Sequence, residues 1–224
     1  MKISVERNQF LKALSHGQSV VEKRTTIPIL SHVLLQAQND TLTLTTTDMD
    51  LALVESITAM VATPGAITVS ASMLFDIVRK LPDGVQIELT LNPDNDQVAI
   101  HSGKSKFNLS SLPATQFPKL TQDELPHSFK MSCEELCRLI DRAKFAMLTD
   151  DSRYYLNGIY FHPHGEEGRK VYRSVATDAH RLACIDMALP DGAGDVPGII
   201  VGRKTLTEVR KLLEEQSTDV LISL

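Results

Sequence analysis

The chain has 224 residues and a formal net charge of −5; 42% of its residues are hydrophobic and 23% are charged. This is the composition of a soluble globular protein with a real core, and the length suits two domains of about 100–150 residues each. No apolar run approaches the ~18 residues of a membrane-spanning helix, and the negative net charge argues against a protein that binds nucleic acid over its whole surface, although not against one basic surface.

Residues 1–111 predict two halves with the same order of elements. Alternating apolar positions predict a strand over 2–6, a helix over about 8–21 and strands near 29–37, 41–47 and 51–59. The second half repeats this order, with a strand near 66–70, a helix near 72–81 and strands near 85–91, 97–102 and 105–111. Glu6 introduces an acidic residue too early for a signal peptide.

A proline-rich stretch follows the first set of elements, with Pro113, Pro118 and Pro126. Proline cannot continue a helix, so we expect an extended linker here. We therefore place a first domain at 1–120, a linker at 121–128 and a second domain at 129–224.

The clearest helix is predicted over 133–147. Ser132 and Glu135 have the spacing of a capping box. Apolar residues recur on one face of this helix, and Arg138 and Arg142 lie on the opposite face. The three cysteines, Cys133, Cys137 and Cys184, form no metal-binding framework, so we expect free thiols in the cytoplasm.

An internal repeat relates the two predicted domains. Thr47-Asp48 and Thr177-Asp178 both end an alternating strand, 130 residues apart. Leu30 and Leu156 correspond at an offset of 126, and Val69 and Val201 at an offset of 132. The chain therefore predicts an α+β fold built from tandem strand-helix-three-strand repeats.

Positive charge is concentrated on the predicted helices and the loops beside them. Segments 6–24, 72–81, 132–153 and 203–214 carry 14 Lys and Arg against 10 Asp and Glu, whereas the rest of the chain carries 9 against 18. If the helices share one face of antiparallel sheets, that face is a basic surface suited to phosphates.

Several motifs, in order along the whole chain, resemble the family of bacterial DNA sliding clamps, the beta subunits of DNA polymerase III. They are Lys2-Ile-Ser-Val-Glu-Arg7, Pro28-Ile-Leu30, Thr47-Asp48, Ser111-Leu-Pro113 with Phe117-Pro118, Arg153-Tyr-Tyr-Leu-Asn-Gly158 and Thr177-Asp-Ala-His-Arg-Leu182. The resemblance implies a non-catalytic processivity factor that needs no cofactor: a head-to-tail homodimeric ring of three-domain subunits whose helices line the hole around duplex DNA. It also implies that the third domain and part of the second are absent here, so these 224 residues are not expected to close a ring.

Two equivalent loops are the strongest candidates for DNA contact. Arg24 follows the first helix, and Arg153, Tyr154 and Tyr155 follow the equivalent helix of the second copy. Cations beside aromatic rings suit phosphates and stacked bases. The resemblance implies DNA contacts for Arg24, Tyr154 and Tyr155, whereas Asp150 replaces a glutamine of the family and opposes phosphate. The helix cations expected to add diffuse attraction are Arg79, Lys80, Arg138, Arg142, Arg203, Lys204, Arg210 and Lys211.

The resemblance also implies two protein-binding surfaces. A pocket for short hydrophobic peptides of the polymerase and the clamp loader would be lined by Leu156, Thr177, Ala179, His180, Arg181 and Leu182. Ala179 replaces the usual glycine, and we expect its methyl group to narrow the pocket floor. Phe107 and Leu109, on the last strand of the first domain, would contact the partner subunit.

Four other interpretations arise from the motifs and the overall pattern of the chain. Asp48, Asp178 and His180 raise the alternative of a hydrolase or nuclease, with Asp178 and His180 expected on one face of a strand; a protein-interaction scaffold without DNA association is a third class. The first copy has Asp50 in place of the histidine, which disfavours catalysis. Gly103-Lys104-Ser105 lacks the earlier glycine of a phosphate-binding loop, and a metal site at His162, His164, Glu166 and Glu167 is disfavoured, so we expect no metal.

Overall fold

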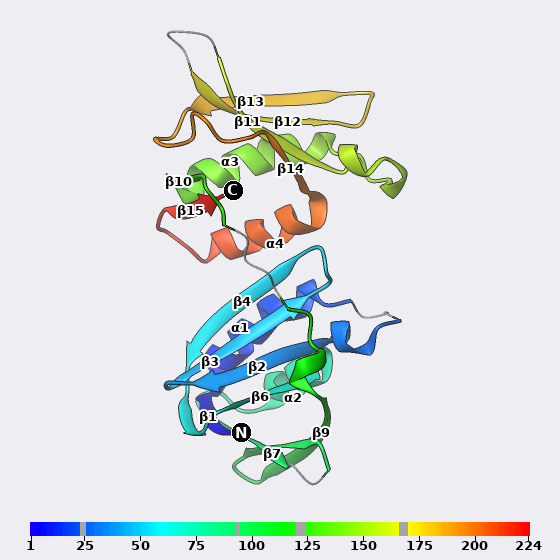
Figure 1. The fold of residues 1–224 in the computed structure, drawn as a ribbon, viewed down its shortest axis with the longest axis vertical. Helices are drawn as coiled ribbons and strands as arrows, with labels where there is room; N and C mark the ends of the chain where they lie inside the picture. The colour runs from blue at the N-terminus through cyan, green and yellow to red at the C-terminus, as the bar shows by residue number, and fades with distance from the viewer. Residues whose placement is uncertain (23–25, 93–94, 120–123, 166–169) are drawn as a thin grey trace. The chain divides into compact units, whose positions relative to one another are not determined.

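Alternating apolar residues form antiparallel strands in both halves of the chain. The computed structural model describes residues 1–22, 26–92, 95–119, 124–165 and 170–224. The chain divides into two units, Met1–Thr121 and Gln122–Leu224, and each is described by itself (Figure 1).

The first unit contains a nine-stranded antiparallel sheet in the order β4-β3-β2-β6-β9-β8-β7-β1-β5. Its strands are β1 (Lys2–Glu6), β2 (His32–Gln38), β3 (Thr41–Thr47), β4 (Ala52–Thr58), β5 (Met60–Thr63), β6 (Gly65–Ser70), β7 (Gln86–Asn92), β8 (Gln97–Ser102) and β9 (Ser105–Leu112). Its two α-helices, α1 (Arg7–Val20) and α2 (Ala71–Lys80), pack against each other. The order of strands and helices therefore gives two strand-helix-strand halves within one unit.

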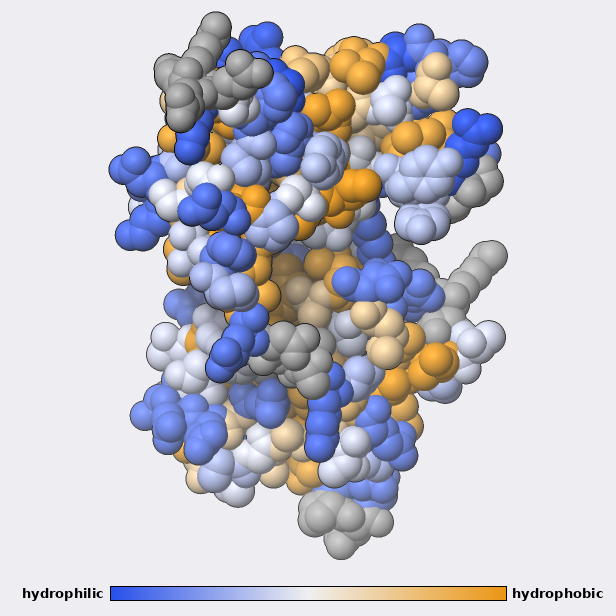
Figure 2. Space-filling model, turned by 45° about the horizontal axis from the view of Figure 1, so that its top comes forward, coloured by the Kyte–Doolittle hydropathy of each residue, from blue (hydrophilic) through white to orange (hydrophobic). Residues whose placement is uncertain are grey.

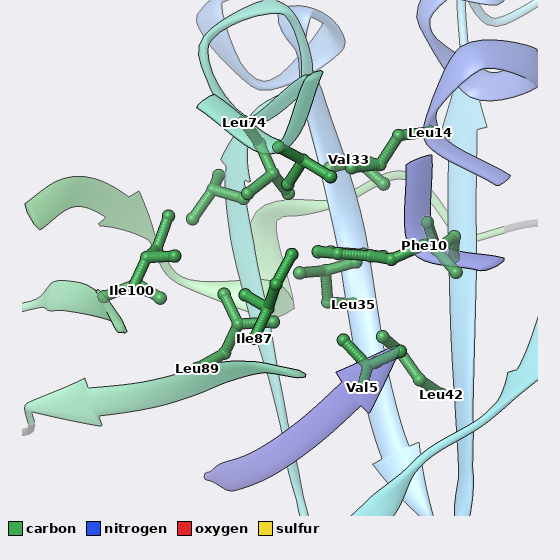
Figure 3. Close-up of a cluster of buried hydrophobic side chains, with 14 of the residues drawn as sticks. Val5, Phe10, Leu14, Val33, Leu35, Leu42, Leu74, Ile87, Leu89 and Ile100 are labelled. Atoms are coloured by element: carbon green, nitrogen blue, oxygen red, sulfur yellow. The ribbon is translucent and has the colours of Figure 1, made fainter. Parts of the chain in front are cut away.

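Both helices contribute to the core of the first unit. Phe10 and Leu14 of α1 and Leu74 of α2 lie with side chains of β2 and β7, among them Leu35 and Ile87 (Figure 3). These five side chains are at most 2% exposed. Burial at this level contributes ~1.5–3 kcal/mol per large apolar side chain, so this cluster holds the helices against the sheet.

Arg7, the first residue of α1, is buried and joins the two helices. Its guanidinium donates to the carbonyl oxygens of Val78 and Arg79, at 3.1 and 2.8 Å, and to Asp83 Oδ1 at 2.6 Å. The carbonyl groups at a helix C-terminus lack partners within the helix, and a cation there is favourable. Arg7, which lies in the basic segment 6–24, therefore has a structural role that the sequence does not reveal.

The second unit contains a four-stranded antiparallel sheet, β13-β12-β11-β14, and a separate pair, β10-β15. Its elements are β10 (Ser128–Met131), α3 (Cys133–Ala143), β11 (Gly158–His164), β12 (Val171–Thr177), β13 (Leu182–Ala188), β14 (Ile199–Gly202), α4 (Arg203–Glu214) and β15 (Val220–Ser223). α3 packs against β12, β13 and α4. The predicted capping box is present, since Ser132 accepts from the amide of Glu135 at 3.2 Å and its own amide donates to that side chain.

The internal repeat is visible in the hydrogen-bonded register. The order β4-β3-β2-β6 of the first unit corresponds to β13-β12-β11-β14 of the second. His32 pairs with Ser70, and Gly158 pairs with Gly202, at the same offsets of 126 and 132 residues that the sequence shows. The two sheets thus use equivalent residues as partners.

The structure differs from the predicted elements in four places. The strand expected from 29 is preceded by a 3-10 turn, Pro28–Ser31, and the stretch expected to be fully extended contains another, Ala114–Gln116. The predicted helix over 133–147 ends at Ala143 and continues as a 3-10 turn, Lys144–Ala146. β5 was not predicted, because its four residues are too few to show a period.

Candidate nucleic-acid interface

The aromatic loop of the second unit is exposed. It spans the 3-10 segment Asp151–Leu156, in which Arg153 is non-helical with φ −124° and ψ 70°. Tyr154 is 81% exposed and Tyr155 is 54% exposed, and their rings meet edge to face with centroids 5.7 Å apart. Arg153 is also exposed, so the loop presents one cation and two rings to solvent, which is the combination that binds phosphates and unstacked bases.

The neighbouring acid is exposed as well. Asp150, one residue before this 3-10 segment, therefore places a negative charge beside the aromatic loop. Arg24, in the equivalent loop of the first unit, lies outside the described residues. Of the two predicted loops, the second therefore provides the described part of the candidate interface.

Three helix cations have a carboxylate partner. The ion pairs are Arg79 with Asp76, Arg210 with Asp141 and Lys211 with Glu208, at N–O distances of 3.0, 3.0 and 2.9 Å. Burial raises the pKa of Asp141, but hydrogen bonds from Lys144 and Arg210 outweigh burial and hold it below its ordinary value. These pairs lower the positive charge that the sequence places on the helices.

Three other helix cations are better placed to meet phosphates. Lys80, Arg138 and Arg142 are exposed, and among the residues that the structure describes they form no ion pair. Arg138 and Arg142 lie one turn apart on α3. Lys204 is exposed too, whereas Arg203 is half-buried and its guanidinium donates to backbone carbonyl groups.

Exposure of apolar residues alone does not locate a site. Exposed large apolar side chains occur in both units, and the face drawn in Figure 2 shows hydrophobic residues scattered among hydrophilic ones. Apolar atoms supply more than half of an ordinary protein surface. The candidate interface therefore rests on the loop and on the helix cations.

The Thr-Asp motif of the repeat forms a tight turn between two strands. Thr177 Oγ1 accepts from the amide of Ala179 at 3.2 Å, and Asp178 Oδ1 accepts from the amides of His180 and Arg181, both at 3.0 Å. These bonds, that of His180 first, hold the pKa of Asp178 below its ordinary value. In the first unit, Thr47 and Asp48 make the same bonds to the next residues.

The expectation that Asp178 and His180 share a strand face was wrong. β12 ends at Thr177 and β13 begins at Leu182, so both residues lie in the turn. Ala179 has φ +73°, and its counterpart Met49 has φ +84°. The glycine that the resemblance led us to expect at position 179 would adopt this conformation without strain, since L-residues disfavour positive φ.

Of the residues proposed for a peptide pocket, those from Thr177 to Leu182 follow one another through the turn between β12 and β13, and Leu156 lies just before β11, the strand that pairs with β12. Leu182 is 64% exposed, His180 and Arg181 are exposed, and Leu156 and Thr177 are partly buried. The guanidinium of Arg181 lies 5.5 Å from the ring centroid of Phe145, which is itself 56% exposed. Phe145 was not among the predicted site residues, because an aromatic residue in a mainly apolar stretch reads from sequence as part of the core.

The two residues proposed for the subunit contact differ in burial. Phe107 is 38% exposed, whereas Leu109 is 4% exposed and belongs to the core of the first unit. Within the described residues, β9 pairs with β8 from Ser105 to Ser110, and with β6 only at Ser111 and Leu112. The edge of β9 beside Phe107 is therefore the accessible part of this strand.

The remaining motifs have structural explanations. Gly103 has φ +57° in the turn between β8 and β9, as a tight hairpin requires. His162 stacks on Tyr160, with ring centroids 4.6 Å apart, and meets His164 edge to face; Glu166 and Glu167 lie outside the described residues. In the part of the chain that the structure describes, no group of three or more His, Cys, Asp or Glu residues is arranged to hold a metal, and no helix is long and apolar enough to cross a membrane.

Family models match both units. Residues 1–121 match the N-terminal domain of the DNA polymerase III beta subunit, and residues 130–224 match its central domain. The chain belongs to the DNA polymerase III beta subunit family. Its two units, one for each matched domain, explain why the internal repeat runs through the whole chain.

Curated relatives of this beta subunit family are similar over nearly the whole chain. The beta sliding clamp of Caulobacter vibrioides is 46% identical over 225 residues, which cover all of this chain and 60% of that protein. The beta sliding clamp of Escherichia coli K12 is 39% identical over 216 residues, covering 96% of this chain and 57% of that protein. The chain thus spans about 60% of the length of the curated relatives it matches.

Solved beta subunit structures share the fold. A Caulobacter crescentus beta sliding clamp matches the whole chain with a TM-score of 0.97 and 46% identity, covering 60% of that chain. A Bartonella birtlesii sliding clamp bound to griselimycin matches the whole chain with a TM-score of 0.95 and 45% identity, covering 60% of that chain. The α+β sliding-clamp fold predicted from the sequence is confirmed.

Proposed function

We propose that this chain is part of a DNA sliding clamp, a non-catalytic processivity factor whose ring encircles duplex DNA and tethers the replicative polymerase. Family membership and relatives named beta sliding clamp support the proposal. The observation that carries the DNA contact is the exposed loop of Arg153, Tyr154 and Tyr155.

Weak contacts suit this function. A closed ring holds DNA by topology, so its side chains need only guide the duplex and need not grip it. Lys80, Arg138 and Arg142 are exposed cations on helices, and each attracts phosphates without specifying a base sequence. Two exposed rings beside Arg153 add a place where an unstacked base can rest.

Protein partners are proposed for two surfaces. The turn Thr177–Leu182 offers the exposed Leu182 side chain and the His180 ring to a short hydrophobic peptide of a polymerase or clamp loader. The accessible edge of β9 and Phe107 suit the partner subunit of a homodimer, while Leu109 supports the strand from within. We place this activity in the cytoplasm, where the three free cysteines stay reduced.

The hydrolase alternative is less well supported. The carboxylates of Asp48 and Asp178 accept backbone amides in equivalent turns, so both motifs are explained by folding. A scaffold without DNA contact differs in one measurable property, since only the clamp shows salt-sensitive association with DNA.

The test of DNA contact is the double variant Tyr154→Ala and Tyr155→Ala. Fluorescence anisotropy with a primed duplex at low ionic strength should show weaker binding, because base–aromatic stacking contributes ~1–3 kcal/mol per base. Tyr160→Ala is the matched control, since Tyr160 lies on β11 and stacks on His162. Equal affinity for the double variant and the parent chain would remove the loop from the interface.

The peptide surface has a separate test. Leu182→Ala should weaken binding of a clamp-binding peptide to a clamp with three domains, as isothermal titration would measure. The exposed Leu182 side chain contributes little to the core, so folding should be unaffected. An unchanged affinity would refute the assignment of Leu182 to the pocket.

A further inference from the structure

Arg203 closes the base of the aromatic loop. Its Nη2 donates to the carbonyl oxygens of Met147 and Leu148, both at 3.0 Å, and its Nε donates to Asn157 Oδ1 at 2.9 Å. The backbone amide of Arg203 also donates to the carbonyl oxygen of Asn157 at 3.0 Å. Arg203 thus binds both Met147 and Leu148, which precede the loop, and Asn157, which follows it.

Two backbone hydrogen bonds also hold the loop. The amide of Leu148 donates to the carbonyl oxygen of Leu156 at 3.0 Å, and the amide of Asn157 donates to that of Tyr154 at 3.1 Å. The exposed rings of Tyr154 and Tyr155 contact each other. The position of both rings therefore depends on how firmly the base of the loop is held.

The geometry requires an arginine. A planar guanidinium has several N–H donors in a fixed geometry, so it can reach the carbonyl groups on one side and Asn157 on the other. The ammonium group of a lysine is a compact point charge without this fixed geometry. In the first unit, Arg7 uses its guanidinium in a similar way: it begins α1 and donates to the carbonyl groups at the end of α2. Ala71, which begins α2 in the first unit as Arg203 begins α4 in the second, has no side chain that could make such bonds.

We propose that Arg203 is a positioning residue of the aromatic loop and does not itself bind phosphate. Its donors are directed at the carbonyl groups of residues 147 and 148 and at Asn157, so it orders Arg153, Tyr154 and Tyr155 before DNA arrives. Ordering the loop in advance removes that entropic cost from binding. This inference rests on the proposed function, in which the loop contacts DNA.

The test compares Arg203→Lys with the parent chain by hydrogen exchange and by DNA binding. Losing hydrogen bonds to a charged donor should make the amides of Leu148 and Asn157 exchange about ten-fold faster or more. The same variant should bind primed duplex DNA several-fold more weakly, although its charge is unchanged. Amides of α3 should keep their protection, which shows that the unit stays folded.

The matched control is Arg173→Lys. Arg173 donates through Nε and Nη2 to both carboxylate oxygens of Asp186, at 2.6 and 2.9 Å, and lies on β12. This variant loses a two-pronged arginine contact of the same kind, so loop exchange and DNA affinity should stay as in the parent chain.

The outcomes distinguish a failure of the positioning role of Arg203 from a failure of the proposed DNA contact of the loop. Weaker DNA binding without faster loop exchange would mean that Arg203 contacts phosphate directly, and would overturn the proposal. Faster loop exchange with parental DNA affinity in Arg203→Lys, together with weak binding by the Tyr154 and Tyr155 double variant, would also overturn the positioning role of Arg203. The proposed DNA contact of the loop would then stand. Parental DNA affinity in the double variant would refute the DNA contact of the loop and, with it, any role for Arg203 in presenting it.

Discussion

Replacing Ala179 by glycine should stabilise the second unit. Ala179 has φ +73° in the turn between β12 and β13, a left-handed conformation that costs an L-residue ~1–2 kcal/mol. Glycine adopts it without that cost but loses more backbone entropy on folding, by ~0.4–1 kcal/mol relative to alanine. The difference is a net stabilisation of about 0.5–1 kcal/mol, since Ala179 is exposed and buries no side chain.

The assay is thermal unfolding followed by circular dichroism. For a unit of this size, a stabilisation of about 1 kcal/mol raises Tm by about 4–8 °C. Met49 has φ +84° at the equivalent place and is 65% exposed, so Met49→Gly should stabilise the first unit for the same reason. Two turns in separate units thus provide independent measurements of one effect.

Ala188→Gly is the control, because Ala188 lies on β13 in ordinary strand conformation. There the same substitution should destabilise the unit by ~0.5–1 kcal/mol. If Ala179→Gly and Ala188→Gly both lowered Tm, positive φ would not be the reason for the family glycine, and the explanation from the pocket floor would be preferred.

Two further predictions concern the first unit. Arg7→Lys should destabilise it by ~1.5–3 kcal/mol in urea unfolding, because the carbonyl groups of Val78 and Arg79 lose charged hydrogen bonds; a change within experimental error would show that Arg7 does not secure α2. Burial lowers the pKa of His32, so the unfolded chain binds the proton more readily, and stability should fall as pH drops through the unfolded value of about 6.5. This part of the pH dependence should disappear in His32→Gln, and its persistence would assign it to other groups.

Much of the fold was predictable because its signals are local. The capping box of Ser132 and Glu135 depends on residues three apart, and the alternation of the strands is visible within a few residues. The repeat offsets then relate the paired residues of one unit to those of the other. β5 escaped prediction because its four residues are too few to show a period. The turn at Asp178 was misread because alternation continues to its edge, whereas the turn depends on side-chain hydrogen bonds.

The candidate site was less predictable, because sequence shows which residues are charged but not what they bind. Arg203 appeared as one cation among several on a helix, yet its donors are directed at backbone carbonyl groups. Leu109 and Phe107 share a strand face by spacing, but only Phe107 reaches the surface. The partners of Arg203 are 46 to 56 residues away along the chain, so no local sequence pattern indicates them.

The partners that helix cations have within the protein predict how strongly salt weakens DNA binding. Of the eight helix cations proposed from the sequence, Arg79, Arg210 and Lys211 have carboxylate partners and Arg203 binds carbonyl groups. Each phosphate neutralised adds ~0.9 to the slope of log affinity against log salt concentration, so the other four helix cations (Lys80, Arg138, Arg142 and Lys204) together with Arg153 give a slope of at most about 4.5. All eight helix cations together with Arg153 would give about 8. Anisotropy titrations with duplex DNA at several salt concentrations measure this slope, and a value near 8 would show that the ion pairs open when DNA binds. A low slope would suit the proposed sliding, since a duplex held by few phosphate contacts is released as easily as it is attracted.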